Sequence, residues 1–145
     1  MTTAQDVAAY ILRKLGRMTA MKLQKLAYYS QAWSLVWDEK PLFRDRVEAW
    51  VNGPVVPNLY AVHCGQFDVK SWPKGNPENL SKVQRETVDA VLEFYGDKSS
   101  QWLSELTHSE DPWKDARQGL SPMQRGGNEI THASMAEYYG SLPRT

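Results

Sequence analysis

Hydrophobic residues recur at intervals of three and four over the first forty positions, a spacing typical of helices. Thr3 precedes the first of these stretches, and Asp6 lies three residues later, as in a helix-capping box. The pattern therefore predicts a helix over residues 4–15, which Gly16 ends. Its predicted apolar face consists of Val7, Ala8, Ile11, Leu12 and Leu15.

The second stretch, residues 20–37, is apolar on most of its sides. Thr19 is placed to cap it, and Leu23, Leu26, Trp33 and Trp37 follow helical spacings along it. A helix that is apolar nearly all round is normally surrounded by other elements. We therefore expect this helix to lie at the centre of the fold.

The character of the sequence changes after residue 40. Residues 42–44 and 47–51 are short segments, and the second alternates apolar and polar positions, which predicts a small β-hairpin between the two. The stretch NGPVVP, residues 52–57, predicts a rigid corner that leads into a short helix from Pro57 to Gly65. An isolated hairpin is marginal in water, so we expect Trp50 to anchor it to the central helix.

Further helices are predicted in the second half of the chain. Ser81 and Gln84 form another capping-box pattern, and the predicted apolar face behind them runs from Val83 to Tyr95. Ser99 or Ser100, Asp111 and Thr131 head the remaining helices. The predicted fold is mainly α: residues 1–145 form a compact single-domain helical bundle around a central hydrophobic helix, with a small β-hairpin.

Composition narrows the classes of function. The chain has 17 basic and 17 acidic residues, and this balance argues against a general nucleic-acid binder. Residues 86–115, however, hold eight acidic side chains against two basic ones. A solvated helix surface explains this, and a surface that steers a charged partner is the alternative. Most of the six tryptophans are expected in the core, with one or two at an interface.

Cellular location is the next constraint. Cys64 is the only cysteine, so the chain forms no internal disulfide bond. No run of about 18 apolar residues predicts a membrane span, and the first residues lack the order of a signal peptide. We expect a cytoplasmic protein.

Residues with chemical potential are few. His63, Cys64, His108 and His132 do not have the spacing of a zinc site, Cys64 is expected to be a small buried side chain, and His108 is expected at a helix end. Glycine-rich phosphate loops and metalloprotease motifs are absent from the sequence. We predict a protein that is not an enzyme and needs neither metal nor cofactor. A cysteine–histidine nucleophile at Cys64 is the enzymatic alternative.

Three segments resemble a known family. They are MTAMKLQKLAYYSQAWSL from Met18, KPLFRDRVEAWVNGPVVPNLY from Lys40 and LSELTHSEDPWKDAR from Leu103. Together they resemble the Panacea domain, also described as phage-associated GepA-like or SocA-like proteins. The resemblance extends from about Thr3 to Tyr139, and its most specific part is the order of the first two segments.

The resemblance implies an antitoxin of a bacterial or phage toxin–antitoxin system that neutralises a cognate toxin by direct protein contact. It implies a mainly helical fold with a small β element, and no catalytic residue or cofactor. One alternative is a proteolytic adaptor that delivers a partner to a protease, with a protease or chaperone as second partner. Another is a small DNA-binding regulator of phage or host genes, in which Lys22 and Lys25 would contact the nucleic acid.

The family signature falls on the central helix and the hairpin region. We expect its polar members either to contact the toxin or to fix the scaffold, with a pair between Lys25 and Glu48 as the favoured structural role. The partner-binding or scaffold residues carried over are Lys22, Gln24, Lys25, Tyr29, Trp33, Glu48, Trp50, Gly53, Pro54, Val55, Val56 and Tyr60.

Overall fold

A computed structural model of the chain describes residues 1–143. In this part of the chain the helices are α1 (Ala4–Leu15), α2 (Ala20–Trp37), α3 (Pro57–His63), α4 (Lys82–Tyr95), α5 (Ser100–Ser109), α6 (Asp111–Ala116) and α7 (His132–Gly140), with a 3-10 turn, η1 (Pro77–Asn79). The strands are β1 (Met18–Thr19), β2 (Glu48–Trp50), β3 (Gly53–Val55) and β4 (Asp68–Val69). The predicted fold class, mainly α with a small β-hairpin, is confirmed.

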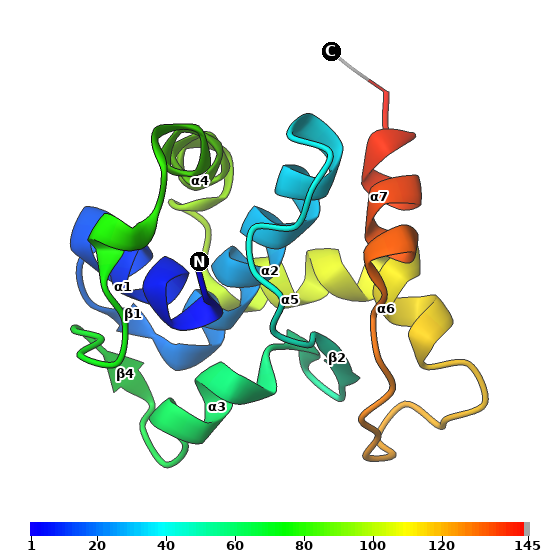
Figure 1. Cartoon of the computed structure of the whole chain (residues 1–145). Helices are drawn as coiled ribbons and strands as arrows, with labels where there is room; N and C mark the ends of the chain where they lie inside the picture. The colour runs from blue at the N-terminus through cyan, green and yellow to red at the C-terminus, as the bar shows by residue number, and fades with distance from the viewer. Residues whose placement is uncertain (144–145) are drawn as a thin grey trace.

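Helix α2 lies at the centre of the molecule, as its apolar pattern predicts. Helices α1 and α4 lie on one side of it and α7 on the other (Figure 1), and α5 and β3 also contact it. Most of its residues from Ala20 to Ser34 are buried, including the polar side chains of Gln24, Lys25 and Gln31. The polar residues of this central helix must therefore be satisfied by neighbours rather than by water.

The helix starts are the most accurate of the predictions. Thr3 with Asp6 and Ser81 with Gln84 both form complete capping boxes, and Ser99 rather than Ser100 caps α5. One start was misplaced by a residue, because Glu110 occupies the cap position before α6 and Asp111 is the first helical residue.

The predicted hairpin is wrong in its first strand. Residues 42–44 form no strand; instead Gln31, buried in α2, accepts hydrogen bonds at its side-chain oxygen from the backbone N–H groups of Leu42 and Phe43. Strand β2 pairs with β3, Ala49 opposite Pro54, so the predicted corner at Gly53 and Pro54 is itself a strand. Pro54 is tolerated there because this strand lies at the edge of the pair.

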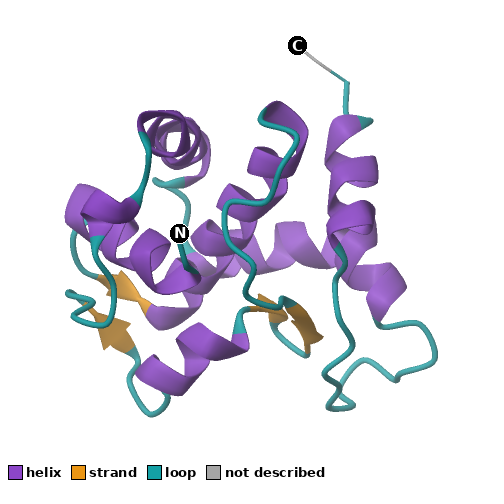
Figure 2. Ribbon diagram, viewed as in Figure 1, coloured by secondary structure: helices purple, strands orange, loops and turns teal. Residues whose placement is uncertain are grey.

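Residues 128–130 extend the hairpin on its other side. The N–H of Ala49 donates to the carbonyl of Asn128, and that of Ile130 donates to Val47. A second strand pair, β1 with β4, joins the start of α2 to the loop after α3. Both pairs lie in the lower half of the molecule in Figure 2.

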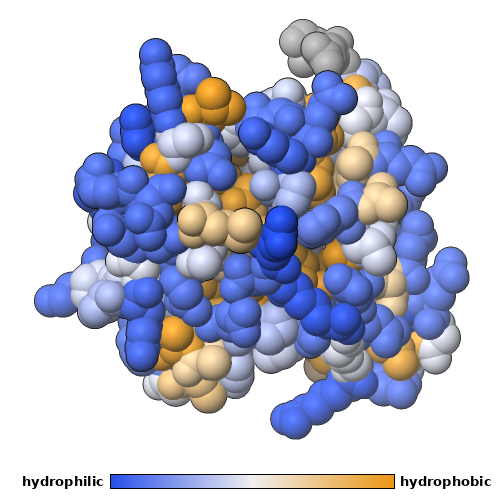
Figure 3. All heavy atoms as spheres, in the orientation of Figure 1, coloured by the Kyte–Doolittle hydropathy of each residue, from blue (hydrophilic) through white to orange (hydrophobic). Residues whose placement is uncertain are grey.

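The distribution of large apolar side chains departs from expectation. Of the six tryptophans only Trp72 is fully buried, and the others are partly or largely exposed. The prediction that most of the tryptophans lie in the core is therefore wrong. Leu15 and Val83 also face solvent instead of completing the faces of α1 and α4. Hydrophobic residues on the face in Figure 3 form small patches among hydrophilic ones. Within residues 1–143, none of the helices combines the length and apolarity needed to cross a bilayer.

Candidate functional site

The residues carried over from the family signature do not form one site. Gln24, Glu48, Trp50, Val55 and Tyr60 line a common cleft next to the hairpin. Tyr29 and Trp33 lie farther along α2, beside a second groove on another face. Lys25, Gly53, Pro54 and Val56 are buried between these two regions, and Lys22 is half-buried near the start of α2.

Gln24 fixes the end of the hairpin to α2. Its side-chain oxygen accepts the N–H of Val56 at 2.8 Å, and its amide nitrogen reaches the Val56 carbonyl at 3.3 Å and His63 at 2.9 Å. All three residues are buried. A single glutamine thus satisfies the N–H of Val56, adds a donor to its carbonyl, which also accepts the N–H groups of Leu59 and Tyr60, and orients the ring of His63.

Glu48 does not pair with Lys25, so the expected link between hairpin and central helix is wrong. One carboxylate oxygen of Glu48 lies 2.8 Å from the Arg46 guanidinium, and the other accepts the Trp50 indole N–H at 2.9 Å. Arg46 also reaches Glu129 and the carbonyl of Gly127. Glu48 therefore organises the outer side of the hairpin and not its contact with α2.

Lys25 is completely buried, and its ammonium nitrogen has no hydrogen-bond partner in the described part of the chain. Burial lowers the pKa of Lys25 to about 7, because an unpaired charge is poorly solvated inside the protein. A Cβ atom on Gly53 would lie 2.6 Å from Lys25 Cε and 3.0 Å from Thr107 Oγ1. Gly53, with φ of +122°, thus leaves the space that the lysine occupies.

The cleft has a volume of about 710 Å³. The rings of Trp50 and Tyr60 meet edge to face across it at 5.0 Å between centroids, and Tyr60 is 39% exposed. Arg125 and the backbone of Gly126 and Gly127 form the facing wall. The cleft therefore offers two aromatic side chains and one cation on a surface whose backbone is held from several sides.

Two residues that sequence reasoning missed hold the hairpin in place. The buried Arg117 guanidinium donates to the carbonyl of Ala49 at 2.9 Å, and the Trp113 indole donates to the carbonyl of Trp50 at 2.7 Å. Trp50, expected to anchor the hairpin to α2, is instead half-buried and faces the cleft. Arg117 also donates to the carbonyls of Ser121 and Gln124 and so shapes the loop after α6.

The sequence contains only a weak indication that Arg117 has a structural role. It is a lone arginine directly after a short helix that begins with a proline, next to a predicted loop. Nothing in that pattern states that its hydrogen bonds go to β2, which lies 68 residues earlier in the chain. Trp113, one of the six tryptophans expected mostly in the core, is only partly buried.

The three histidines have different neighbours, and Cys64 is adjacent to His63 only in sequence order. Cys64 is exposed, so the prediction of a small buried side chain is wrong. His63 contacts Gln24, His132 contacts Gln31, and His108, in the last turn of α5 as expected, stacks on Trp113 at 4.2 Å. Burial, and secondly the charge of Lys25, lower the pKa of His108. Among residues 1–143, no group of three or more potential metal ligands comes together.

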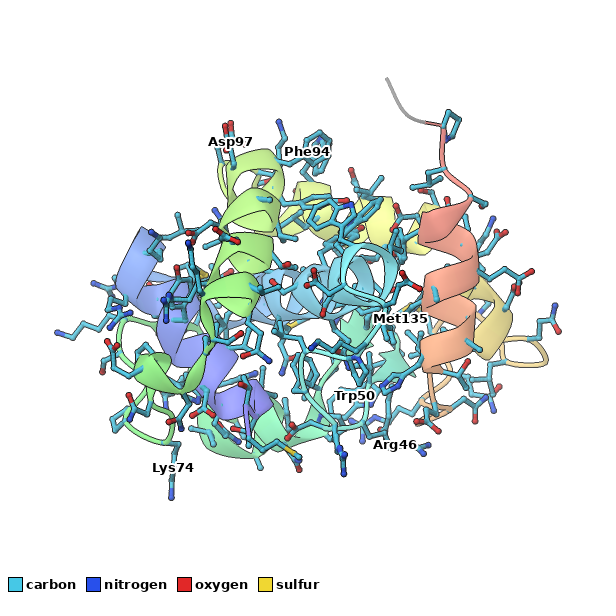
Figure 4. All side chains as sticks on the ribbon, turned by 45° about the horizontal axis from the view of Figure 1, so that its top comes forward. Arg46, Trp50, Lys74, Phe94, Asp97 and Met135 are labelled. Atoms are coloured by element: carbon cyan, nitrogen blue, oxygen red, sulfur yellow. The ribbon has the colours of Figure 1, made fainter. Side chains whose placement is uncertain are left out.

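The second groove lies between α2, α4, α5 and α7 and has a volume of about 650 Å³. The Tyr29 ring stacks on Tyr95 at 4.1 Å near its floor, and the Trp33 indole donates to the Tyr95 hydroxyl at 3.0 Å. Figure 4 labels Trp50 at the cleft and Phe94 at the groove, on opposite sides of the molecule. Sequence reasoning treated Tyr29 and Trp33 as part of the same signature as Trp50, and the structure separates them.

Comparison with known proteins gives one family. A family model described as "Antitoxin SocA-like, Panacea domain" matches residues 23–114, more than half of the chain. The match includes the cleft residues Trp50 and Tyr60 and most of α2, whereas α1 and α7 lie outside it. Neither the curated proteins nor the solved structures contain a match.

Proposed function

This chain belongs to the SocA-like Panacea antitoxin family, and we propose that it neutralises a cognate toxin in the cytoplasm by direct protein–protein contact. The family match carries the proposal, since it supports an antitoxin-type, non-enzymatic role. We further propose that residues 1–145 act as one domain, because α1 and α7, outside the match, both pack on α2.

We propose that the toxin contacts the cleft around Trp50 and Tyr60. Tryptophan and tyrosine are the residues that most often carry binding energy at protein interfaces, and both line this cleft. The backbone beneath them is fixed by Gln24 from α2, by Trp113 from α6 and by Arg117. A surface that is already ordered loses less conformational entropy on binding.

The proposal is tested by co-expression with the product of the neighbouring reading frame. We expect that product to arrest growth alone, and this chain to restore growth and to co-purify with it. Restoration that disappears in a strain lacking a cytoplasmic protease would favour the adaptor alternative. Restoration without co-purification, but with changed transcription of the toxin gene, would favour a DNA-binding regulator.

A matched pair of variants tests the cleft. Tyr60→Ser removes an exposed aromatic ring from the cleft, and Phe67→Ser removes one that is 79% exposed outside it. We expect Tyr60→Ser to weaken toxin binding about tenfold or more and Phe67→Ser to leave it unchanged. Equal effects of the two variants in a binding titration would contradict a contact at the cleft.

A further inference from the structure

The groove between α2, α4, α5 and α7 exposes three large aromatic side chains. Trp37, Phe94 and Trp102 line it and are 46%, 63% and 41% exposed. Trp37 stacks on Trp33 at 5.0 Å, so two indole rings form one wall. Exposed aromatic side chains gathered in one concave place are typical of a binding surface.

A carboxylate lies within this aromatic lining. Glu110, at the junction of α5 and α6, lines the groove and is only 6% exposed. Its Oε1 accepts hydrogen bonds from the hydroxyls of Tyr29 and Tyr139, both at 2.7 Å. In the described part of the chain its Oε2 accepts none, yet it is not sealed from solvent. One carboxylate oxygen is therefore held rigidly while the other is open to the groove.

The environment of Glu110 favours an incoming cation. Burial raises the pKa of Glu110 and so disfavours its charged form, while the hydrogen bonds from the two tyrosines lower that pKa and an incoming cation would lower it further. Residues 86–115, which supply half of the groove lining, carry seven further acidic side chains against two basic ones, all outside the lining itself. At the groove edge Lys98 already lies over the Trp102 ring at 5.2 Å, next to Asp97 at 3.5 Å. Trp102, Lys98 and Asp97 thus combine an aromatic ring, a cation and a carboxylate at the groove edge, as an incoming cation would do with the aromatic rings and Glu110 inside the groove.

We infer that this groove is a second toxin-binding surface, which receives an arginine side chain presented between apolar residues of the toxin. The planar guanidinium would stack on the indole rings and donate to the free oxygen of Glu110, a combination that suits arginine better than lysine. The apolar neighbours of the arginine would cover Trp37, Phe94 and Trp102. The inference rests on the proposed antitoxin function for the identity of the partner, but not for the chemistry of the pocket.

The pocket chemistry is tested on the purified chain without any toxin. N-acetyl-arginine amide and N-acetyl-citrulline amide have nearly the same shape, but only the first is charged. In a titration followed by the indole N–H resonances, we expect the arginine compound to shift Trp33, Trp37 and Trp102. Trp50, Trp72 and Trp113 lie outside the groove and should not move. Absence of shifts, or equal shifts with citrulline, would overturn the inference.

Two variants assign the shifts to the groove. Glu110→Gln keeps an oxygen for the tyrosine hydroxyls and removes the charge, and we expect it to reduce arginine affinity at least fivefold. Glu105→Gln removes an exposed charge from α5 outside the groove and serves as its control. If Glu110→Gln does not fold, Trp37→Gln at the exposed edge replaces it. Unchanged affinity in the folded variant refutes the pocket.

The cellular experiment separates this inference from the antitoxin proposal. The unaltered chain should neutralise the toxin, and the affinity for the toxin is then measured for Glu110→Gln and Trp37→Gln. A loss of affinity of at least fivefold in both variants supports the groove as a toxin contact. Full affinity in both variants overturns the groove as a toxin contact and leaves the antitoxin proposal standing. Arginine binding by a chain that neutralises nothing would instead refute the antitoxin proposal and with it the assigned partner.

Discussion

The two surfaces flanking α2 each lie near one buried ionisable residue, and the protein treats the two residues differently. Near the hairpin, Lys25 has no hydrogen-bond partner in the described part of the chain, and Gly53 and Thr107 enclose it. Near the groove, Glu110 accepts two tyrosine hydroxyls and keeps one oxygen open. Burial lowers the pKa of Lys25 and raises that of Glu110, so it favours the neutral form of each side chain.

The difference separates scaffold from surface. A sealed, unpaired amine contributes no recognition, and its cost to folding must be offset by the packing around it. A carboxylate with one oxygen anchored and one open is oriented for a partner before the partner arrives. The hairpin side therefore presents aromatic side chains over a rigid interior, whereas the groove presents a charge.

The largest expected effect comes from removing the sealed amine with Lys25→Met. In the unfolded chain the lysine keeps its proton up to about its usual pKa of 10.5, whereas the folded pKa is about 7. Between these values the unfolded state binds more protons, so stability rises with pH over that window and is lowest below about 7. The difference corresponds to about 4–5 kcal/mol. We expect the methionine variant to lack this rise and to be more stable than the original chain at pH 6.

Urea unfolding at pH 6 and at pH 10 measures this effect, and Glu110→Gln provides the contrast. The folded pKa of Glu110 is raised, so its contribution falls as pH rises above the unfolded value near 4.5. Glu110→Gln should therefore remove a fall in stability with rising pH, the opposite sign from the rise that Lys25→Met removes. A Lys25→Met variant whose advantage is the same at both pH values would mean that Lys25 is not the sealed base described.

A smaller effect, this time a loss of stability, is expected for Gly53→Ala. The added Cβ meets Lys25 Cε at 2.6 Å, and φ of +122° strains any L side chain. Together, overpacking and strain should cost about 2–4 kcal/mol. The free energy of unfolding from urea titration measures the loss.

Gly119→Ala is the matched control, because Gly119 also has positive φ, +88°, but has nothing within 4 Å of its added Cβ. We expect it to cost about 1–2 kcal/mol, the backbone strain alone. In a Lys25→Ala background the cost of Gly53→Ala should fall by about 1 kcal/mol or more, since the clash is gone. Additive costs would show that the lysine and the glycine do not share the space.

The smallest effect on stability is expected for Trp50→Ala. Trp50 is half-buried, and the variant loses one hydrogen bond to Glu48 and the edge contact with Tyr60. The expected cost is about 1–2 kcal/mol. Trp102→Ala removes an indole from the groove instead. Thermal unfolding and toxin affinity, measured together on both variants, apportion binding between the two surfaces; a stable Trp50→Ala protein with full affinity would exclude the cleft.

Local signals explain most of what the sequence predicted correctly. The starts of α1 and α4 were read from a capping residue and its partner three positions later, and those of α2, α5 and α7 from a serine or threonine at the helix start; each cap is present in the structure. The hairpin was harder, because β2 is three residues long and its pairing depends on which segment reaches it. Residues 42–44 have strand-forming side chains, but the backbone N–H groups of Leu42 and Phe43 donate to the Gln31 side chain instead of to a strand.

The candidate site was predictable in its residues and not in its arrangement. The signature named Gln24, Trp50 and Tyr60, which line one cleft, together with Trp33, which lines another, and Tyr29, which is buried beside it. Gln24, Tyr29 and Trp33 all lie on α2, and helix periodicity places Gln24 on a different side of it from Tyr29 and Trp33. Trp37, Trp102 and Glu110 were read as core or as a helix start, since a sequence pattern does not distinguish an aromatic side chain in a core from one in a groove.

The sequence by itself determined the helices, their caps, the central position of α2 and the family, because these depend on residues a few positions apart or on short ordered segments. Which hydrogen-bond partners the buried polar groups find depends on the tertiary structure. Within residues 1–143, Lys25 has no hydrogen-bond partner, Glu110 bonds Tyr29 from 81 residues earlier, and Arg117 bonds the carbonyl of Ala49. Hydrogen bonds and desolvation act between groups that the fold brings together, so distant partners become visible only once the helices have packed.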